Sequence, residues 1–181
     1  MKMTTTAIDG VLLVDPEVLP DERGFFMEVW NAAAFAAAGL GVAFVQDNQS
    51  RSRRGVLRGL HYQAARPQGK LIRVLSGAVF DVAVDIRRAS PTFGRWFGAR
   101  LTAAGRRMLW APPGVAHGFL TLSATADVAY KCTDFHLPGD ERAIAWNDPD
   151  LAIAWPLGPG ERPILSARDA AAGPFREASL P

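Results

Sequence analysis

The chain is built from short runs of apolar and β-branched residues that glycine or proline repeatedly interrupts. Such runs are too short for typical helices, and turn residues between them are characteristic of antiparallel strands. We predict strands at residues 11–14, 25–30, 44–46, 55–63, 70–75, 78–86, 96–101, 107–110, 118–122, 127–132 and 143–146. This many short strands with frequent turns favours an all-β sandwich or barrel.

Helices are expected in only two places. Residues 32–40 are rich in alanine, the best helix former, and Gly39 supplies a stop signal. A second short helix is predicted near residues 167–172, in a tail that is otherwise rich in proline and glycine. No linker or internal repeat divides the sequence, so we predict a single domain over residues 1–181.

Composition argues against several classes of protein. The 181 residues are 49% hydrophobic and 21% charged, as in a globular protein that is long enough for a full core. A net charge of +2 gives no reason to expect nucleic-acid or membrane binding. The only cysteine, Cys132, has no partner for an internal disulfide, and no apolar run would span a bilayer or form a signal core. We therefore expect a cytoplasmic protein that binds neither nucleic acid nor membrane.

The segment at residues 55–63 combines a fixed cation with one of only three histidines. Arg58 and His61 are three positions apart, so a regular strand would place their side chains on opposite faces. Gly59 lies between them, and a glycine inside a strand often marks a bulge or a close approach of two backbones. If a bulge brings the two side chains together, they suit an anionic substrate that must also lose a proton.

Two further segments indicate a particular kind of β-barrel. Residues 112–119 fit the Pro-x-Gly-x-x-His pattern of the cupin jelly roll, and residues 75–79 resemble the tight turn between adjacent cupin strands. Many cupins bind a metal through a His-x-His pair, a glutamate and a later histidine. Here Gln63 replaces the second histidine of the pair, which leaves only His61 and His117. Two imidazoles form a poor metal site, so we predict acid–base chemistry without a metal or other cofactor.

Longer motifs, in order along nearly the whole chain, carry a resemblance to one family. They lie at residues 21–28, 46–50, 55–63, 68–74, 80–87, 90–94, 113–119, 130–134, 146–149 and 165–169. On these motifs the chain resembles the dTDP-4-dehydrorhamnose 3,5-epimerases. The resemblance implies a metal-free, cupin-type jelly-roll barrel with a few short helices, and a homodimer. It also implies epimerisation of a dTDP-sugar, dTDP-4-dehydro-6-deoxy-D-glucose, at C3 and C5 in dTDP-L-rhamnose biosynthesis.

The chemistry of this reaction gives a role to each matching residue. The protons at C3 and C5 flank the C4 ketone and are acidic, and inversion needs a base, an acid on the opposite face and a stabiliser for the enolate oxygen. The resemblance implies that His61 is the base, that Asp169 orients it and that Tyr130 is the acid. Lys70 matches the residue expected near the C4 oxygen, and Arg58 is assigned near the same site.

A second group of matching residues is implied to bind the substrate, mainly its nucleotide part. Arg23, Phe26 and Glu28 match a segment that contacts thymidine in the family, across the dimer interface. Arginine forms paired hydrogen bonds with phosphate oxygens, so Arg23 and Arg58 are both candidates for the diphosphate. The full implied set is Arg23, Phe26, Glu28, Gln46, Asn48, Arg58 and His117.

Several of these residues also have an ordinary structural explanation. Taken alone, Tyr130 would pack in a core, Asp169 would cap a helix and Lys70 would be solvated. His117 either lines the active site or only hydrogen-bonds within its turn. Asp81 is either the partner of His117 or a polar residue at the barrel mouth.

One departure from the family leaves detail open. After residue 134 the family often carries two tyrosines, whereas this chain has Phe135 and His136. The resemblance does not separate a double epimerase from relatives that invert only C3 or only C5 in antibiotic sugar pathways. Two other classes fit the sequence less well: a metal-dependent cupin would need a third ligand, and a non-catalytic sugar-binding cupin would need no base and acid together.

Overall fold

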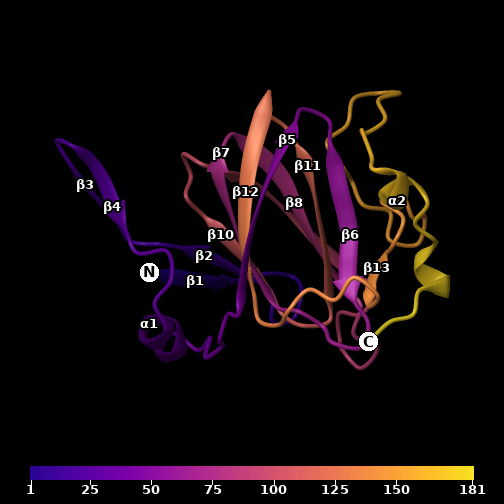
Figure 1. Ribbon diagram of the computed structural model, residues 1–181, viewed down its shortest axis with the longest axis horizontal. Coiled ribbons are helices and arrows are strands. Elements are labelled where there is room, and N and C mark those ends of the chain that lie inside the picture. The colour runs from indigo at the N-terminus through magenta and orange to yellow at the C-terminus, as the bar shows by residue number, and fades with distance from the viewer.

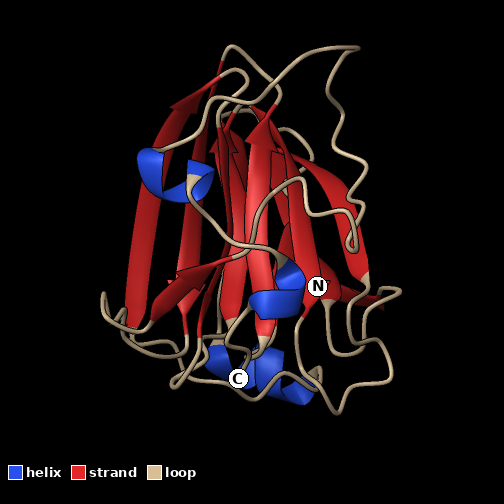
Figure 2. Ribbon diagram, turned by 90° about the vertical axis from the view of Figure 1, so that its right-hand side faces the viewer, coloured by secondary structure: helices blue, strands red, loops and turns tan.

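The computed structural model describes all 181 residues and has the cupin-type jelly-roll architecture that the sequence predicts. Two antiparallel sheets face each other, as Figures 1 and 2 show. One sheet has the strand order β1-β2-β10-β7-β12-β5, and the other has the order β13-β6-β11-β8-β9. A separate two-stranded hairpin, β3-β4, projects from one side (Figure 1).

The elements have the following bounds. The six-stranded sheet contains β1 (Lys2–Thr5), β2 (Leu12–Asp15), β10 (Met108–Ala111), β7 (Lys70–Ser76), β12 (Thr125–Cys132) and β5 (Gln46–Arg53). The five-stranded sheet contains β13 (Glu141–Ala143), β6 (Leu57–Gln63), β11 (Val115–Thr121), β8 (Ala78–Asp85) and β9 (Trp96–Thr102). The remaining elements are β3 (Val18–Asp21), β4 (Gly24–Met27), α1 (Ala32–Ala37), α2 (Ala167–Ala170) and the 3-10 turn η1 (Phe175–Glu177).

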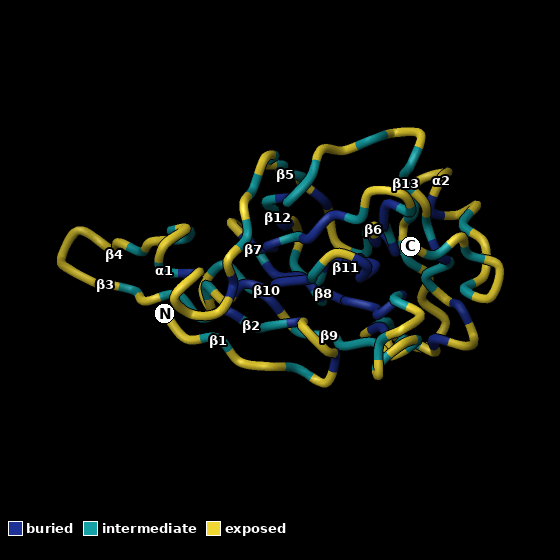
Figure 3. The backbone as a smooth tube through the Cα atoms, turned by 90° about the horizontal axis from the view of Figure 1, so that it is seen from below, coloured by how far each residue is buried: buried dark blue, intermediate teal, exposed yellow.

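Three apolar clusters hold these layers together. The first lies between the two sheets and includes Ile72, Leu101 and Leu109, none of which is exposed. The second packs the C-terminal segment against the outer face of the five-stranded sheet, and the third packs α1 against the six-stranded sheet. Figure 3 shows the central strands buried and the β3-β4 hairpin exposed. Because the core fills only part of the space between the sheets, polar side chains line the rest.

The β3-β4 hairpin, which we call the arm, turns at the Asp-Glu-Arg-Gly sequence of residues 21–24. Asp21 pairs with Gly24 across the turn, and the Arg23 guanidinium donates to the Asp21 carboxylate at 2.6 Å. The Arg106 guanidinium lies 4.0 Å from the centre of the Phe25 ring, a cation–π contact. Phe26 is 68% exposed, the largest exposed fraction of any large apolar side chain in the protein.

A carboxylate at the end of β8 organises the loop between β8 and β9. Asp85 is fully buried and accepts hydrogen bonds from Arg87, Ser90 and Thr92, with the Ser90 contact at 2.5 Å. Burial alone would raise the pKa of Asp85, but these hydrogen bonds outweigh it and lower the pKa to about 2. The ionised carboxylate is therefore part of the folded structure.

We expect Asp85→Asn to destabilise the protein by about 2 kcal/mol at pH 7. A depressed carboxyl pKa stabilises the fold above the ordinary value of 3.8, and this stability is lost as the pH falls toward about 2. The difference in free energy of unfolding between wild type and variant should therefore narrow at pH 3. Urea denaturation at both pH values measures it, and an equal difference at pH 7 and pH 3 would contradict this account.

No helix in the structure combines the length and apolar character needed to cross a membrane.

Candidate active site

A bulge in β6 brings Arg58 and His61 into the same pocket. Across the β6–β11 pair, His61 lies opposite His117 and Arg58 lies opposite Phe119, with a shift of register between them. Gly59 makes the shift feasible, because a Cβ there would lie 2.5 Å from the Cα of Gly118. The bulge that the sequence suggested is therefore confirmed, and so is its effect on the two side chains.

The pocket lies between the two sheets and has a volume of about 290 Å³. Seven of the residues implied by the family resemblance line it, and an eighth, Asp169, reaches it through His61. The seven come from both sheets and are Gln46, Asn48, Arg58, His61, Lys70, His117 and Tyr130.

His61 and Asp169 form a short, partly buried pair. Nε2 of His61 lies 2.5 Å from Oδ1 of Asp169, and the two side chains are 25% and 4% exposed. Burial alone would raise the pKa of Asp169, but the hydrogen bond and charge of His61, together with Ser166 and Arg168, hold it below its ordinary value. Asp169 therefore stays ionised, fixes the imidazole and supports a positive charge on it. The imidazole itself remains accessible from the pocket.

A second imidazole lies beside the first. Nε2 of His117 is 3.0 Å from each carboxylate oxygen of Asp81, and Asp81 is fully buried. The pair resolves both open questions from the sequence, because His117 lines the pocket and Asp81 is its partner. His117 therefore faces the same space as His61 from the next strand.

Tyr130 and Lys70 come from the opposite sheet, and neither polar end is bonded within the chain. Burial raises the pKa of Tyr130, with the charges of Cys132 and Glu141 adding to the effect and Arg58 opposing it. The phenol therefore stays protonated. Burial lowers the pKa of Lys70, although nearby acidic groups partly offset this. Both side chains are available to a bound molecule.

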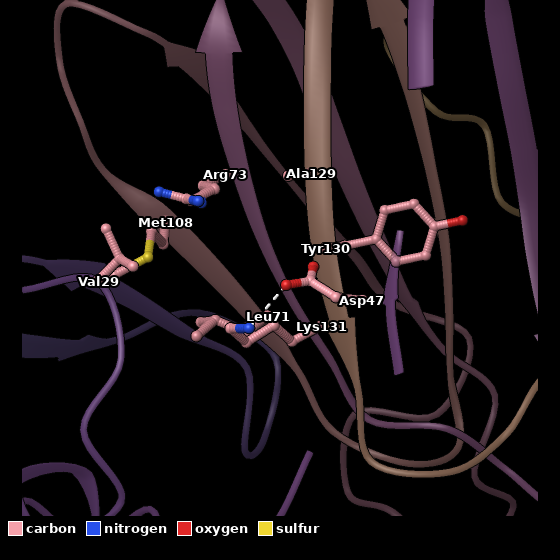
Figure 4. A pocket seen from close by; sticks show the side chains of 8 residues that line it. All are labelled: Val29, Asp47, Leu71, Arg73, Met108, Ala129, Tyr130 and Lys131. Carbon is pink, nitrogen blue, oxygen red and sulfur yellow. Dashed lines mark hydrogen bonds and ion pairs between the residues drawn. The ribbon is translucent and has the colours of Figure 1, made fainter. Parts of the chain in front are cut away.

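Figure 4 shows the other face of β12, where alternation places Lys131 and Ala129. The Tyr130 ring points away from that face, whereas Lys131 forms an ion pair with Asp47 at 2.7 Å. The cavity there holds only about 10 Å³ and is too small for a substrate. The pocket on the inner face of β12 is therefore the candidate active site.

Three implied binding residues lie outside this pocket. Arg23 and Phe26 are on the exposed arm, and Glu28 follows it and accepts a hydrogen bond from Asn31. None of the three lines the pocket of its own chain. Their implied role therefore requires a second copy of the chain.

Several pocket residues were not identified as site residues from the sequence. They are Ser50, Gln68, Phe119, His136 and Glu141. His136 and Glu141 form a 2.9 Å contact, and Arg168 donates to the same carboxylate oxygen at 2.5 Å. Ser50 could have been found from alternation along β5, since it shares a face with Gln46 and Asn48. Phe119 carries the same signal, because it lies two positions after His117 on β11. Gln68 and His136 come from loops and Glu141 from the short strand β13, and alternation does not identify these three.

No group of three or more histidine, cysteine, aspartate or glutamate side chains is arranged to hold a metal ion. The absence of a metal from the reaction stays a prediction.

A jelly-roll pocket with a histidine–aspartate pair facing a tyrosine defines a cupin-type enzyme for acid–base chemistry. The family model for dTDP-4-dehydrorhamnose 3,5-epimerase matches residues 5–177. The chain is 55% identical to the dTDP-4-dehydrorhamnose 3,5-epimerase of Pseudomonas aeruginosa, over 98% of each chain. It therefore belongs to the dTDP-4-dehydrorhamnose 3,5-epimerase family, and is an isomerase.

Solved structures agree with this assignment. The dTDP-6-deoxy-D-glucose-3,5-epimerase of Legionella pneumophila, in complex with dTDP-4-keto-L-rhamnose, is 51% identical and superposes with a TM-score of 0.95 over 99% of this chain and 97% of that one. A 3′-monoepimerase of Streptomyces bikiniensis, in complex with dTDP-quinovose, is 34% identical, with a TM-score of 0.87 over 94% of this chain and 86% of that one. The fold is therefore shared by double and single epimerases.

Proposed function

We propose that this isomerase inverts C3 and C5 of dTDP-4-dehydro-6-deoxy-D-glucose and gives dTDP-4-dehydro-L-rhamnose, for dTDP-L-rhamnose biosynthesis in the cytoplasm. One observation carries the proposal. His61 on β6 and Tyr130 on β12 belong to opposite sheets and line the same pocket. A sugar ring held between them has a base on one face and an acid on the other, which is what inversion of a carbon requires.

His61 is the base that removes the proton. The imidazole takes a proton from C3 or C5, and the electron pair left on carbon moves toward the C4 oxygen to form an enolate. Asp169, 2.5 Å away, stabilises the imidazolium that results. The charged pair is partly shielded from water, which strengthens the interaction.

The opposite wall stabilises the enolate and returns the proton. Lys70 has no ion-pair partner in the chain and is the cation on this wall that can contact the developing charge on the C4 oxygen. Tyr130 donates its hydroxyl proton to the carbon from the face opposite His61. Its raised pKa keeps that proton in place at neutral pH. His61 then releases its proton to water and Tyr130 takes one up from water, and the same steps at the second carbon give the doubly inverted product.

Proton NMR of the product tests the reaction. Incubation of the purified protein with dTDP-4-dehydro-6-deoxy-D-glucose should give ring couplings that report inversion at both C3 and C5. Inversion at only one carbon would instead support the second candidate, a monofunctional epimerase, which the likeness to the 3′-monoepimerase keeps open. Binding without any turnover would support a non-catalytic sugar-binding protein.

We further propose that the protein is a homodimer in which the arm of each protomer completes the pocket of its partner. Leu19, Phe25 and Phe26 are 54%, 52% and 68% exposed, and all three lie on the arm. Exposed apolar side chains gathered on a projecting hairpin favour contact with another protein surface. In a two-fold dimer the exchange would be reciprocal, so Arg23, Phe26 and Glu28 would each reach a site.

Mixing two inactive variants should restore activity if the arm acts on the partner. His61→Ala lacks the base but keeps its arm, whereas Arg23→Ala combined with Phe26→Ala keeps the base but lacks arm contacts. A mixed dimer then has one complete pocket, made of an intact site and the arm of the other protomer. Co-expression with two tags, tandem purification and an epimerase assay measure this. A mixed dimer as inactive as its parents would show that each arm serves its own chain or neither.

A further inference from the structure

The carboxylate that pairs with His61 lies on a helix without an apolar anchor of its own. The helix α2 spans only Ala167–Ala170, and Asp169 is its single buried residue. A helix this short is not stable by itself, and none of its side chains belongs to an apolar cluster. Apolar packing at Leu165 and a backbone bridge at Gly173 attach the chain to the barrel on either side of it. Between these two points, polar contacts fix where Asp169 lies.

Both polar side chains of α2 bond to the barrel. Asp169 contacts His61 on β6, and Nη1 of Arg168 donates to Oε2 of Glu141 on β13 at 2.5 Å. The strand β13 is the neighbour of β6, and Ala143, two positions after Glu141, pairs with His61. Figure 1 shows α2 beside these two strands. Adjacent residues of α2 are therefore held against adjacent strands of one sheet.

The ion pair between Arg168 and Glu141 is stronger than a fully solvated one. Burial alone would raise the pKa of Glu141, but hydrogen bonds from Arg168 and His136, together with the charge of His61, lower it. The carboxylate is therefore ionised, and its side chain is only 18% exposed, against 48% for Arg168. A charge-assisted hydrogen bond to a shielded carboxylate is stronger than a contact between solvated charges. The pair is thus able to hold α2 in place.

Arg168 itself does not line the active-site pocket, so its effect on the reaction would pass through the residues that it holds. We propose that the Arg168–Glu141 ion pair is a positioning device, which docks α2 on β13 and thereby keeps the Asp169 carboxylate against His61. The inference rests on the proposed roles of His61 and Asp169 in epimerisation and adds the residues that support them. An imidazole whose carboxylate moves away loses its fixed orientation and the support for its positive charge.

Arg168→Ala tests the proposal. We expect kcat to fall about 10-fold to 100-fold, as for a small displacement of a reacting group. Kd for dTDP, measured by calorimetry, should stay within about 2-fold, because the variant affects the chemical step and not binding. Arg168→Lys keeps the cation and should restore most of the activity. The melting temperature should fall by no more than about 4 °C, because one partly exposed ion pair contributes little to global stability.

Arg176→Ala is the matched control. Arg176 also forms an ion pair within the C-terminal part of the chain, with Asp150 at 2.5 Å, and neither residue lines the pocket. This variant should leave kcat and Kd unchanged. A similar loss of activity in Arg176→Ala would show that any loosening of the C-terminal part has the same effect, and it would overturn the proposal.

A double variant shows whether the two residues act as a pair. If Glu141 acts by holding Arg168, then Glu141→Gln combined with Arg168→Ala should be no slower than the slower single variant. Losses that multiply would show that the two residues act independently, which contradicts the proposal.

Proton NMR of the ligand-free protein reports the geometry without turnover. A short hydrogen bond between imidazole and carboxylate gives a proton resonance far downfield, and His61→Ala should abolish it. We expect Arg168→Ala to shift this resonance upfield or to lose it through exchange with water, whereas Arg168→Lys and Arg176→Ala should keep it.

The NMR result separates this inference from the proposed function. A resonance that changes in Arg168→Ala would support the positioning role even if the wild type proved inactive as an epimerase. An unchanged resonance, or a raised Kd for dTDP with an unchanged kcat, would overturn the inference. A wild type without the resonance would contradict the short His61–Asp169 pair on which the inference depends.

Discussion

His61→Ala should lower the rate of epimerisation by about 100-fold to 10,000-fold, the usual contribution of a positioned general base. The variant removes the only imidazole that is bonded to Asp169, and His117 is already held by Asp81. Both inversions should be lost together, because one base serves both carbons. A coupled assay of product formation with purified variants measures the effect.

Chemical rescue separates a missing base from a damaged pocket. Added imidazole should restore part of the activity of His61→Ala, and His61→Asn, which fills more of the space, should be rescued less well. Both variants should keep the affinity of the wild type for dTDP within a few-fold. Residual activity above a tenth of the wild-type rate would show that another group, with His117 the nearest candidate, removes the proton.

Tyr130→Phe should reduce product formation by about 100-fold to 10,000-fold while proton exchange continues. The variant keeps the ring and the base but removes the donor on the opposite wall. His61 then abstracts a proton and returns one to the same face, so solvent deuterium enters the substrate without inversion. Proton NMR in deuterium oxide distinguishes exchange from epimerisation.

The only other tyrosine provides a matched control. Tyr62 is buried and lies outside the pocket. Its hydroxyl donates a hydrogen bond to the backbone oxygen of Ser179 at 3.1 Å. Tyr62→Phe should leave both exchange and inversion intact. Loss of exchange in Tyr130→Phe would contradict the separate roles of His61 and Tyr130, because it would make the phenol part of the step that removes the proton.

The all-β architecture and the inward-facing catalytic strands were predictable because their residues alternate or carry strong motifs. The strand at Gln46–Arg53 was predicted only at residues 44–46, since its sequence is polar on both faces and gives no apolar period. The short strands at Lys2–Thr5 and Val18–Asp21 were missed for a similar reason, and the latter contains Pro20. The helix predicted to residue 40 ends at Ala37.

The candidate site was also predictable only in part. His61, Lys70 and Tyr130 lie on strands whose motifs match the family, and the structure places them together. Ion pairs between distant parts of the sequence were harder to predict, as for Glu141 and Arg168, which are far apart in the chain. No local pattern reports such a contact. The position of the arm relative to a pocket also depends on a second chain, whose geometry a single sequence does not define.

The measurement that tests the central claim most directly is deuterium incorporation by NMR. Wild type and His61→Ala are incubated in deuterium oxide with dTDP-4-dehydro-6-deoxy-D-glucose, and C3 and C5 are followed separately. The account predicts deuterium at both carbons with the wild type and at neither with the variant. Label at a single carbon with the wild type, or undiminished exchange in His61→Ala, would contradict it.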